Sequence, residues 1–383
     1  MIMTHDTQDG SGYFLYHSIG MYPGKDAEME AAFSGFSRSW GCFDDGQWMR
    51  ALAARQEFLD LWCNLIGAPK GTLTSAENVT TALYSLIGAL PEQHLKNRTL
   101  LVAGDCFPSL HFLLSGLAKR FGFELRTVPL RTGESWVRDE DIIAAWDESV
   151  GLALLTFVTS TASHRCDLES LVAHGRRMGS LVGVDITQGA GLLPFNVNSP
   201  WVDFTLSTSL KWLCGTPGAG IIHVAEPLLA TCEPELRGWF SQDNIFSWDL
   251  DAFAYAGDAR RFDHGTPSVL ACAGSVPALQ WHARQDQAAL LAHNRSLGQA
   301  IIDAAPSLGM ELASPRDSDR RGGSIMLRLP EGAEPAASIN RLRDQGIHTD
   351  CRGRIMRLSP GTVTTAEGVD RLFAGLRGVA KAA

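Results

Sequence analysis

The sequence lacks the patterns that mark several large classes of protein. No apolar stretch approaches the roughly 18 uninterrupted residues of a membrane-spanning helix. It has no run of basic residues, and a net charge of −9 argues against nucleic acid as a partner. The eight cysteines occur singly, without a C-x-x-C pair or a His/Cys cluster at zinc-ligand spacing. We therefore expect no metal site and no membrane contact.

The N-terminal segment lacks a targeting signal. Its first residues, MIMTHDTQDGSGY, show no basic stretch followed by an apolar one, so we expect a cytoplasmic protein. The chain has 383 residues, of which 45% are hydrophobic and 20% charged, as in an ordinary globular protein. This length allows a large core and two domains.

Short apolar segments alternate with amphipathic ones over the first half of the chain. Strands are predicted at 99–104, 124–130, 152–158, 181–185 and 202–207. Helices are predicted at 48–66, from the cap candidate Ser75 to 88, at 109–121 and at 168–178. Because the strands are apolar on both faces, this alternation predicts a mainly parallel sheet covered by helices.

The last hundred residues have a different character. Helices near 275–304, at 336–345 and at 365–379 surround a single clear strand, 323–329, which predicts a smaller α+β domain. We divide the chain into an N-terminal segment (1–47) that packs on the small domain, a large domain (48–270) and a small C-terminal domain (271–383).

A lone lysine, Lys211, follows the strand predicted at 202–207 and precedes a glycine-rich turn. The ordinary interpretation is a surface lysine at a strand end, since a buried ammonium is costly. The alternative is a desolvated lysine whose amine forms an imine. The preceding strand ends in Asp185, and ligands of parallel sheets gather at the carboxyl ends of the strands. We expect Lys211 and Asp185 to share one rim of the sheet.

Two further segments supply the rest of a cofactor pocket. Phe107 and Ser109 follow the strand at 99–104 and offer an aromatic face and a hydroxyl. Residues 78–81 (Asn-Val-Thr-Thr) lie in the first turns of a helix, where free backbone amides suit a phosphate. An amine, a carboxylate, an aromatic ring and a phosphate seat together describe a pocket for pyridoxal phosphate (PLP).

These motifs resemble those of the fold-type-I PLP enzymes of the class V aminotransferase group, and within it the chain is most similar to the kynureninases. The matching segments are His17-Ser18-Ile19-Gly20, Phe107-Pro-Ser109, Asp185-Ile-Thr-Gln188, Ser209-Leu-Lys211, Gly238-Trp239, Gly265-Thr266-Pro267 and Asp350-Cys-Arg352 with the downstream Arg357. The resemblance implies an α/β protein of fold type I. Its large, PLP-binding domain holds a mainly parallel seven-stranded sheet between helices, and its C-terminal domain is a smaller α+β unit.

The resemblance also implies a role for each matched residue. Lys211 would be the catalytic residue and hold PLP covalently, and Asp185 would pair with the pyridinium nitrogen. The other cofactor-binding residues would be Val79, Thr80, Phe107, Ser109, Gln188, Trp239 and Thr266, with Phe107 stacked on the ring. Trp239 and Thr266 would reach the phosphate of a neighbouring subunit, which implies a homodimer. Arg357, with Ser18, would bind the α-carboxylate of the substrate.

Three departures from the kynureninase pattern concern the reaction. Leu210 stands where kynureninases have tyrosine, and Leu110 stands where their Phe-Pro-Ser continues with aspartate. The Leu-Tyr-Asn segment that follows their carboxylate arginine is absent. Leucine can neither donate nor accept a proton. These losses spare PLP binding and affect the chemistry that follows it.

The expected activity is a kynureninase-like hydrolysis of the Cβ–Cγ bond of a 2-amino-4-oxo acid such as kynurenine. The alternatives are a β-eliminating or C–S lyase, a C–C bond-forming enzyme and an aminotransferase acting on another amino acid. A cysteine desulfurase would use Cys351, but this residue takes a phenylalanine position and is expected in the core. A non-catalytic binding protein on the same fold would have lost PLP. The presence of both Lys211 and Asp185 argues against that. The glycine-rich turn at 215–220 matches neither a dinucleotide motif nor a P-loop.

Overall fold

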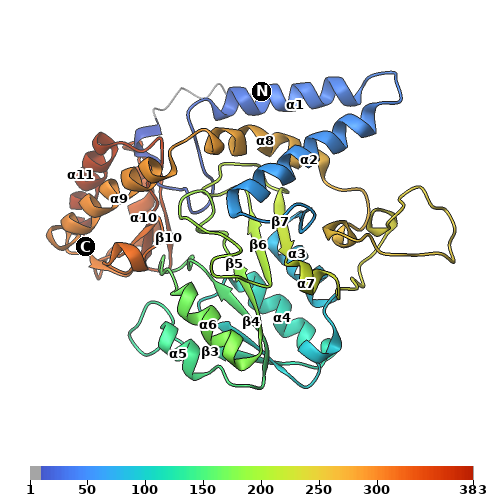
Figure 1. Ribbon diagram of the computed structural model, residues 1–383. Helices are drawn as coiled ribbons and strands as arrows, with labels where there is room; N and C mark the ends of the chain where they lie inside the picture. Colours follow the sequence, from blue (N-terminus) through green and yellow to red (C-terminus); the bar gives the residue numbers. More distant parts are fainter. Residues whose placement is uncertain (1–9, 383) are drawn as a thin grey trace.

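Two β-sheets organise the computed structural model, which describes residues 10–382 (Figure 1). The larger sheet has seven strands in the order β1-β7-β6-β5-β4-β2-β3. They are β1 (Leu73–Ala76), β2 (Thr99–Ala103), β3 (Glu124–Val128), β4 (Val150–Thr156), β5 (Leu181–Asp185), β6 (Phe204–Thr208) and β7 (Gly220–Val224). Only β7 runs antiparallel to its neighbours. The predicted mainly parallel seven-stranded sheet is confirmed.

Helices cover both faces of this sheet because its strands are apolar on both sides. One face packs against α2 (Gln47–Ile66), α5 (Asp139–Ala144), α6 (Leu168–Met178) and α8 (Val269–Ala283). The other face packs against α3 (Val79–Ile87), α4 (Pro108–Phe121) and α7 (Glu226–Leu229). Within β2, Leu101 points into the first layer while Leu100 and Val102 point into the second. Both faces of the sheet are thus covered by helices, so a ligand can reach the sheet only at the ends of its strands.

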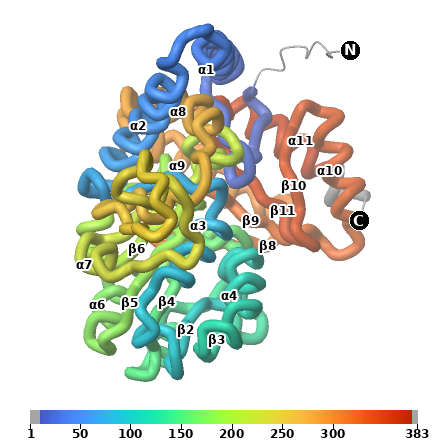
Figure 2. Tube along the Cα trace, turned by 90° about the vertical axis from the view of Figure 1, so that its right-hand side faces the viewer, coloured from blue at the N-terminus to red at the C-terminus, as the bar shows by residue number. Residues whose placement is uncertain are grey.

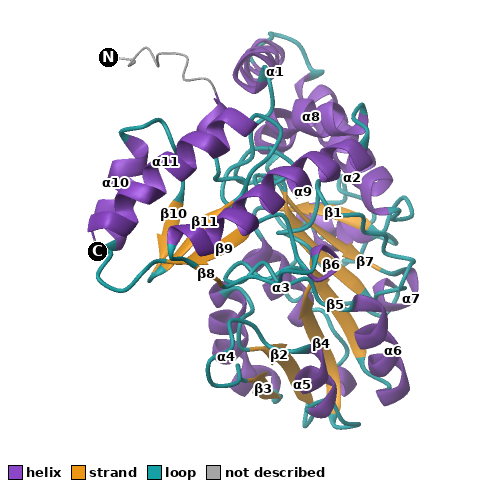
Figure 3. Ribbon diagram, turned by 90° about the vertical axis from the view of Figure 1, so that its left-hand side faces the viewer, coloured by secondary structure: helices purple, strands orange, loops and turns teal. Residues whose placement is uncertain are grey.

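The smaller sheet belongs to the C-terminal part of the chain and is antiparallel throughout. Its order is β10 (Asp350–Arg352), β11 (Ile355–Leu358), β9 (Ile325–Arg328) and β8 (Glu311–Leu312). Its core includes residues of α9 (Gln287–Ala304), α10 (Pro335–Arg343) and α11 (Ala366–Ala382), helices that Figure 3 shows beside the small sheet. This is the smaller α+β unit that the sequence predicts.

The N-terminal segment joins the two sheets. Tyr13 bridges His348 and Leu15 bridges Ser359, which places this segment on the small sheet. The amide of Gly20 then donates to the carbonyl of Leu210 at 2.9 Å. After it, α1 (Lys25–Trp40) runs along α2 and α8 at the top of the large domain (Figure 2). The domain boundaries at 47 and 270 stay predictions, and residues 1–9 of the predicted N-terminal segment lie outside the described residues.

The predicted start of the second helix, at Ser75, is wrong. Ser75 lies in β1 and pairs with Ile221, and α3 begins only at Val79. Its true cap is Asn78, whose side-chain oxygen accepts from the amide of Thr81 at 2.9 Å. Asparagine and serine cap helices equally well, so the strand pairing decides the start. Among the described residues, no helix has the length and apolarity needed to cross a lipid bilayer.

Candidate active site

A cavity of about 610 Å³ opens at the carboxyl ends of β4, β5 and β6. Its walls come from both helix layers and from the turn after β6. Seven predicted site residues border it: Val79, Thr80, Phe107, Ser109, Asp185, Gln188 and Lys211. The structure therefore brings together, in one place, side chains that lie up to 132 positions apart in the chain.

Lys211 stands in the turn that follows β6, and its side chain faces the cavity. The Nζ atom lies 5.4 Å from the centroid of the Phe107 ring. Burial lowers the pKa of Lys211 to about 8; the charge on Arg357 acts in the same direction and Asp185 opposes it. A larger fraction of this amine is neutral near neutral pH than in an ordinary lysine, and only the neutral amine is a nucleophile.

The backbone of Lys211 is held by the N-terminal segment. A Cβ atom on Gly20 would lie 1.8 Å from the carbonyl oxygen of Lys211 and 2.8 Å from Sγ of Cys214. Only glycine allows this close approach. The match at Gly20 therefore has a steric reason, and the N-terminal segment forms part of the support of the lysine.

Asp185 is the last residue of β5 and pairs in register with Leu206 of the parallel strand β6. One carboxylate oxygen accepts from the backbone amide of Thr187 at 2.9 Å. Burial raises the pKa of Asp185, whereas hydrogen bonding from Thr187 and the charge on Lys211 lower it. A buried carboxylate of this kind is stabilised by a cationic group placed in the cavity.

Backbone amides at the start of α3 border the same cavity. Val79 and Thr80 are the first two residues of α3, and the first N–H groups of a helix have no acceptor within it. Asn78 uses its side chain to satisfy the amide of Thr81, so the two amides before it remain available to a ligand. Together with Ser109 at the start of α4, this wall suits an anion such as a phosphate.

Gln188 also borders the cavity, and its amide is fixed on both sides. Its Nε2 atom donates to the backbone carbonyl of His17 at 3.1 Å, and its Oε1 atom accepts from the indole of Trp212 at 3.3 Å. The side chain is therefore held in one orientation beside Asp185 by groups of the N-terminal segment and of the lysine turn.

Arg357 is not among the residues that line the cavity. It sits on β11, opposite Asp350 of β10. Its Nε atom donates to one carboxylate oxygen of Asp350 at 2.8 Å, and its Nη2 atom donates to the other. Although burial acts to raise the pKa of Asp350, contacts from His17 and Arg357 hold it well below its usual range. The positive charge on Arg357 adds, after burial, to the lowering of the pKa of Lys211.

Three other predicted residues do not line the cavity. Ser18 is exposed, and its amide donates to the carbonyl of Leu15. Trp239 lies in a short 3-10 helix (Trp239–Ser241) with 38% of its surface exposed. Thr266 borders a small adjoining cavity that shares Gly218 with the main one. The roles predicted for Ser18, Trp239 and Thr266 stay predictions.

Sequence reasoning assigned no role to several hydroxyl groups of the lining. They are those of Thr156, Ser160, Thr187, Thr208 and Ser268. Thr156 and Thr208 end β4 and β6, so their place at strand ends was a usable signal. The Oγ1 atom of Thr156 is buried without a hydrogen-bond partner among the described residues, which leaves it free for a ligand or a water molecule.

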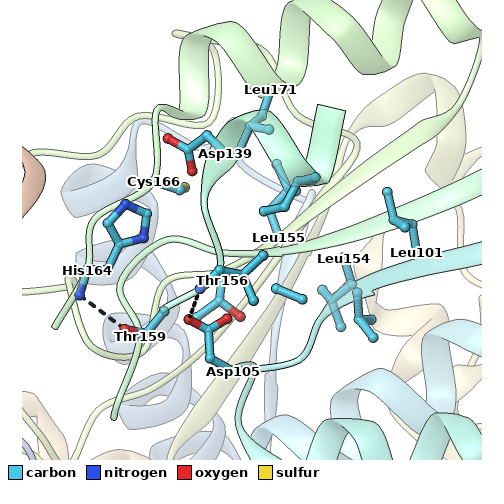
Figure 4. A pocket seen from close by; sticks show the side chains of 14 residues that line it. Leu101, Asp105, Asp139, Leu154, Leu155, Thr156, Thr159, His164, Cys166 and Leu171 are labelled. Atoms are coloured by element: carbon cyan, nitrogen blue, oxygen red, sulfur yellow. Dashed lines mark hydrogen bonds between the residues drawn. The ribbon is translucent and has the colours of Figure 1, made fainter. Parts of the chain in front are cut away.

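A second, much smaller cavity lies behind Thr156 and has room for one water molecule, at about 20 Å³. Asp105, Asp139 and His164 line it (Figure 4). Asp105 accepts a hydrogen bond from the amide of Val137 at 3.0 Å and so anchors the loop that presents Phe107. Burial raises the pKa of Asp105 to about 6, and the charge on Asp139 adds to this.

Asp105→Asn should remove a pH dependence of stability. The pKa of Asp105 is about 6 in the folded chain, against an ordinary 3.8. Because the folded form binds this proton more tightly, the free energy of unfolding falls as the pH rises through this interval. We expect the unchanged protein to lose about 3 kcal/mol relative to Asp105→Asn between about pH 3 and 7. Thermal unfolding across this range measures the difference, and a constant difference would count against it.

The cavity fits PLP on the properties of its own residues. Lys211 offers a desolvated amine, Asp185 offers a buried carboxylate that can accept from a protonated ring nitrogen, and Phe107 offers an aromatic face. The start of α3 offers amides for the phosphate. A single aromatic heterocycle that carries an aldehyde and a phosphate uses all of these groups.

Comparison with known proteins agrees with this chemistry. Residues 60–372 match the family of class-V aminotransferases. The kynureninase of Deinococcus radiodurans is 27% identical over 316 residues, which cover 79% of this chain and 74% of that protein. The kynureninase of Pseudomonas fluorescens is 25% identical over 305 residues, which cover 76% of this chain and 70% of that protein.

Solved structures share the fold across almost the whole chain. A cysteine desulfurase from Thermococcus onnurineus superposes with a TM-score of 0.85 at 18% identity, covering 97% of this chain and 95% of that one. The cystine C–S lyase C-DES also superposes with a TM-score of 0.85, at 20% identity, covering 96% and 98%. These identities support the fold and not a reaction. With the family match and the site described above, the chain belongs to the class V aminotransferase family and is a PLP-dependent enzyme of fold type I.

Proposed function

We propose that this enzyme hydrolyses the Cβ–Cγ bond of a 2-amino-4-oxo acid such as kynurenine, and releases L-alanine and a carboxylic acid. The observation that carries the proposal is the set of residues at the cavity. Lys211, Asp185, Phe107 and Ser109 occupy the positions of the kynureninase motifs and line one pocket. The kynureninases among the relatives add support at 25–27% identity over about three-quarters of the chain.

Each residue that lines the cavity would have its own role in the reaction. Lys211 would hold PLP covalently, and Asp185 would keep the ring nitrogen protonated. When bound, PLP supplies an electron sink for the pair of electrons left at the Cα atom of the substrate. Lys211, once displaced by the substrate amine, is the base in the cavity that can move the Cα proton. Val79, Thr80, Ser109 and Gln188 would hold the phosphate and the ring in place.

A second candidate is β-elimination from an amino acid with a leaving group at Cβ. Leu210 favours it, because this residue borders the cavity beside Lys211 and cannot transfer a proton. Among the described residues that line the cavity, the only ionisable side chains are those of Glu77, Asp185 and Lys211. Elimination needs fewer acid–base groups than hydration of a ketone, so the three ionisable side chains of this cavity suit elimination better.

A desulfurase reaction at Cys351 has little support. The side chain is partly buried against the apolar core of the small domain. Burial raises its pKa to about 11, with Asp350 acting in the same direction. A cysteine nucleophile requires the opposite, a lowered pKa and an accessible thiolate.

The products of the reaction distinguish the two candidates. Purified holoenzyme would be incubated with L-kynurenine or 3-hydroxykynurenine, and separately with a β-substituted alanine. The proposal expects L-alanine and the aromatic acid from the first two substrates. Pyruvate and ammonia from the substituted alanine, without cleavage of either kynurenine, would replace hydrolysis by elimination.

Arg357→Ala should weaken binding of the amino acid far more than binding of PLP. Its guanidinium is the predicted partner for the α-carboxylate, and a hydrogen-bonded ion pair of this kind contributes about 10²-fold in affinity. We expect Kd for L-alanine to rise by that factor while Kd for PLP stays within about threefold. Equal losses for both ligands would remove the carboxylate role from Arg357.

We also propose a homodimer in which Trp239 and Thr266 reach the phosphate held by the other subunit. The segment after Trp239 projects as a loop from the body of the molecule (Figure 1). Phe246, Trp248 and Leu250 in this loop are 78%, 81% and 96% exposed, an apolar surface that a second copy would cover. Light scattering should give twice the chain mass of 41.5 kDa, and the mass of one chain would contradict the dimer. The cytoplasmic location stays a prediction.

A further inference from the structure

A histidine of the N-terminal segment is buried between the two domains. His17 has only 2% of its surface exposed. Its Nδ1 atom lies 2.7 Å from Oγ of Ser359. Its Nε2 atom lies 3.1 Å from Oδ1 of Asp350, although the direction of its N–H falls outside strict hydrogen-bond geometry.

The hydroxyl groups around His17 set the direction of its protons. Oγ of Ser359 is 2.6 Å from Oγ of Ser324, and both serines are buried. If Ser324 donates to Ser359, Ser359 donates to Nδ1, and the proton of a neutral ring then sits on Nε2 and faces Asp350. Burial lowers the pKa of His17, and the positive charges of Arg357 and Lys211 add to this against the effect of Asp350. In this arrangement the Nε2 proton lies on the Asp350 side of the ring, and burial disfavours the charged form of the imidazole.

Asp350 carries this contact on to the arginine. The same oxygen that faces His17 accepts from Nε of Arg357 at 2.8 Å, and the other oxygen accepts from Nη2. Arg352 also approaches Asp350 at 3.5 Å, but its side chain is 67% exposed and solvent weakens its effect. The orientation of the Arg357 guanidinium thus depends on a carboxylate whose position His17 helps to fix.

The backbone of His17 reaches the cofactor side of the same site. Its carbonyl accepts from Nε2 of Gln188, the cavity residue next to Asp185. Three positions further along, Gly20 packs on the carbonyl of Lys211. The segment from His17 to Gly20 therefore contacts Gln188, the turn that holds Lys211, and Asp350. These contacts connect the cavity on the large sheet to Arg357 on the small sheet.

We propose that His17 is a positioning residue that acts through Asp350 to orient Arg357 toward the α-carboxylate of an amino-acid substrate. The inference rests on the proposed carboxylate role of Arg357 and is independent of which bond the enzyme cleaves. Its distinctive consequence is selectivity: His17 contributes to binding of ligands with a carboxylate and not to binding of amines without one.

The test compares two ligands on the holoenzyme. Binding of L-alanine and of ethylamine, which lacks the carboxylate, would be measured by calorimetry for His17→Asn and His17→Gln. We expect His17→Asn to weaken L-alanine binding about tenfold, the loss of one hydrogen bond to a charged group. Ethylamine and PLP binding should stay within about twofold. His17→Gln should retain most of the L-alanine affinity, because its terminal amide reaches the place of Nε2.

Matched variants separate the sources of failure. His174→Asn replaces a histidine of α6 that is hydrogen-bonded to the carbonyl of Trp146 and does not line the cavity. This variant should change the affinity for neither L-alanine nor ethylamine. Arg357→Ala, measured alongside, shows whether the carboxylate role itself holds. If Arg357→Ala weakens L-alanine and His17→Asn does not, the positioning role of His17 is wrong. The positioning role would also be wrong if His17→Asn weakened binding of L-alanine and of PLP equally. It would be wrong as well if His17→Gln weakened L-alanine binding as much as His17→Asn does.

A measurement on the unchanged chain covers the case in which a variant does not fold. In holoenzyme with ¹⁵N-labelled histidine, addition of L-alanine should shift the imidazole resonances of His17, because the carboxylate changes the Arg357–Asp350 pair. Addition of ethylamine should leave these resonances in place. Equal shifts with both ligands, or no shift with either at saturation, would contradict the proposal.

Discussion

Lys211→Ala should slow exchange of the Cα proton of L-alanine with deuterium oxide by about 10³-fold, the loss typical of a positioned acid–base group. Lys211 is the only amine among the described residues that line the cavity, and its lowered pKa suits it to accept a proton near neutral pH. Proton NMR of L-alanine measures the exchange without assuming which bond the enzyme cleaves.

Lys70→Ala provides a matched control for this result. Lys70 is exposed after α2 and does not border the cavity, so its removal should leave the exchange rate unchanged. A rate for Lys211→Ala within about tenfold of the unchanged enzyme would mean that another group moves the proton. Lys211 would then keep at most a role in binding.

Asp185→Asn should lower the same exchange rate by about 10²-fold while PLP stays bound, as expected for loss of a preorganised charge at the reacting group. Asparagine keeps the hydrogen bond from the amide of Thr187 but removes the negative charge. The ring nitrogen then loses the partner that keeps it protonated, and the Cα carbanion is stabilised less.

Cofactor content decides how the Asp185→Asn result is interpreted. PLP should remain stoichiometric, because Lys211 and the start of α3 would hold it without help from Asp185. Slower exchange at full PLP content supports an electronic role for the carboxylate. An unchanged rate at full content would show that the ring works without this charge, and the pairing of Asp185 with the ring nitrogen would be wrong.

The centre of the site was predictable because it depends on local patterns. Apolar segments at 181–185 and 202–207 identify two strands of a parallel sheet, and such strands end at the same rim. This is enough to place Asp185 near Lys211, and β5 and β6 are indeed adjacent. The helix start near Asn78 follows from a similar local signal, although its first residue does not.

The rest of the site depends on contacts between distant segments. β1 is short and partly polar, so nothing in its sequence shows that it pairs with β7, and Ser75 was misread as a helix cap. The contact between His17 and Asp350 joins residues 333 positions apart through the packing of the N-terminal segment on the small sheet. Trp239 and Thr266 do not line the cavity, and their proposed role depends on a second subunit, which no pattern within one chain can place.

Attachment of PLP to Lys211 is the central claim, and chemical reduction tests it most directly. Holoenzyme would be treated with borohydride, digested and analysed by mass spectrometry for peptides that carry a phosphopyridoxyl group. We predict one modified peptide, with the group on Lys211. Modification of a different lysine, or a protein that takes up no PLP and remains unmodified, would contradict the account.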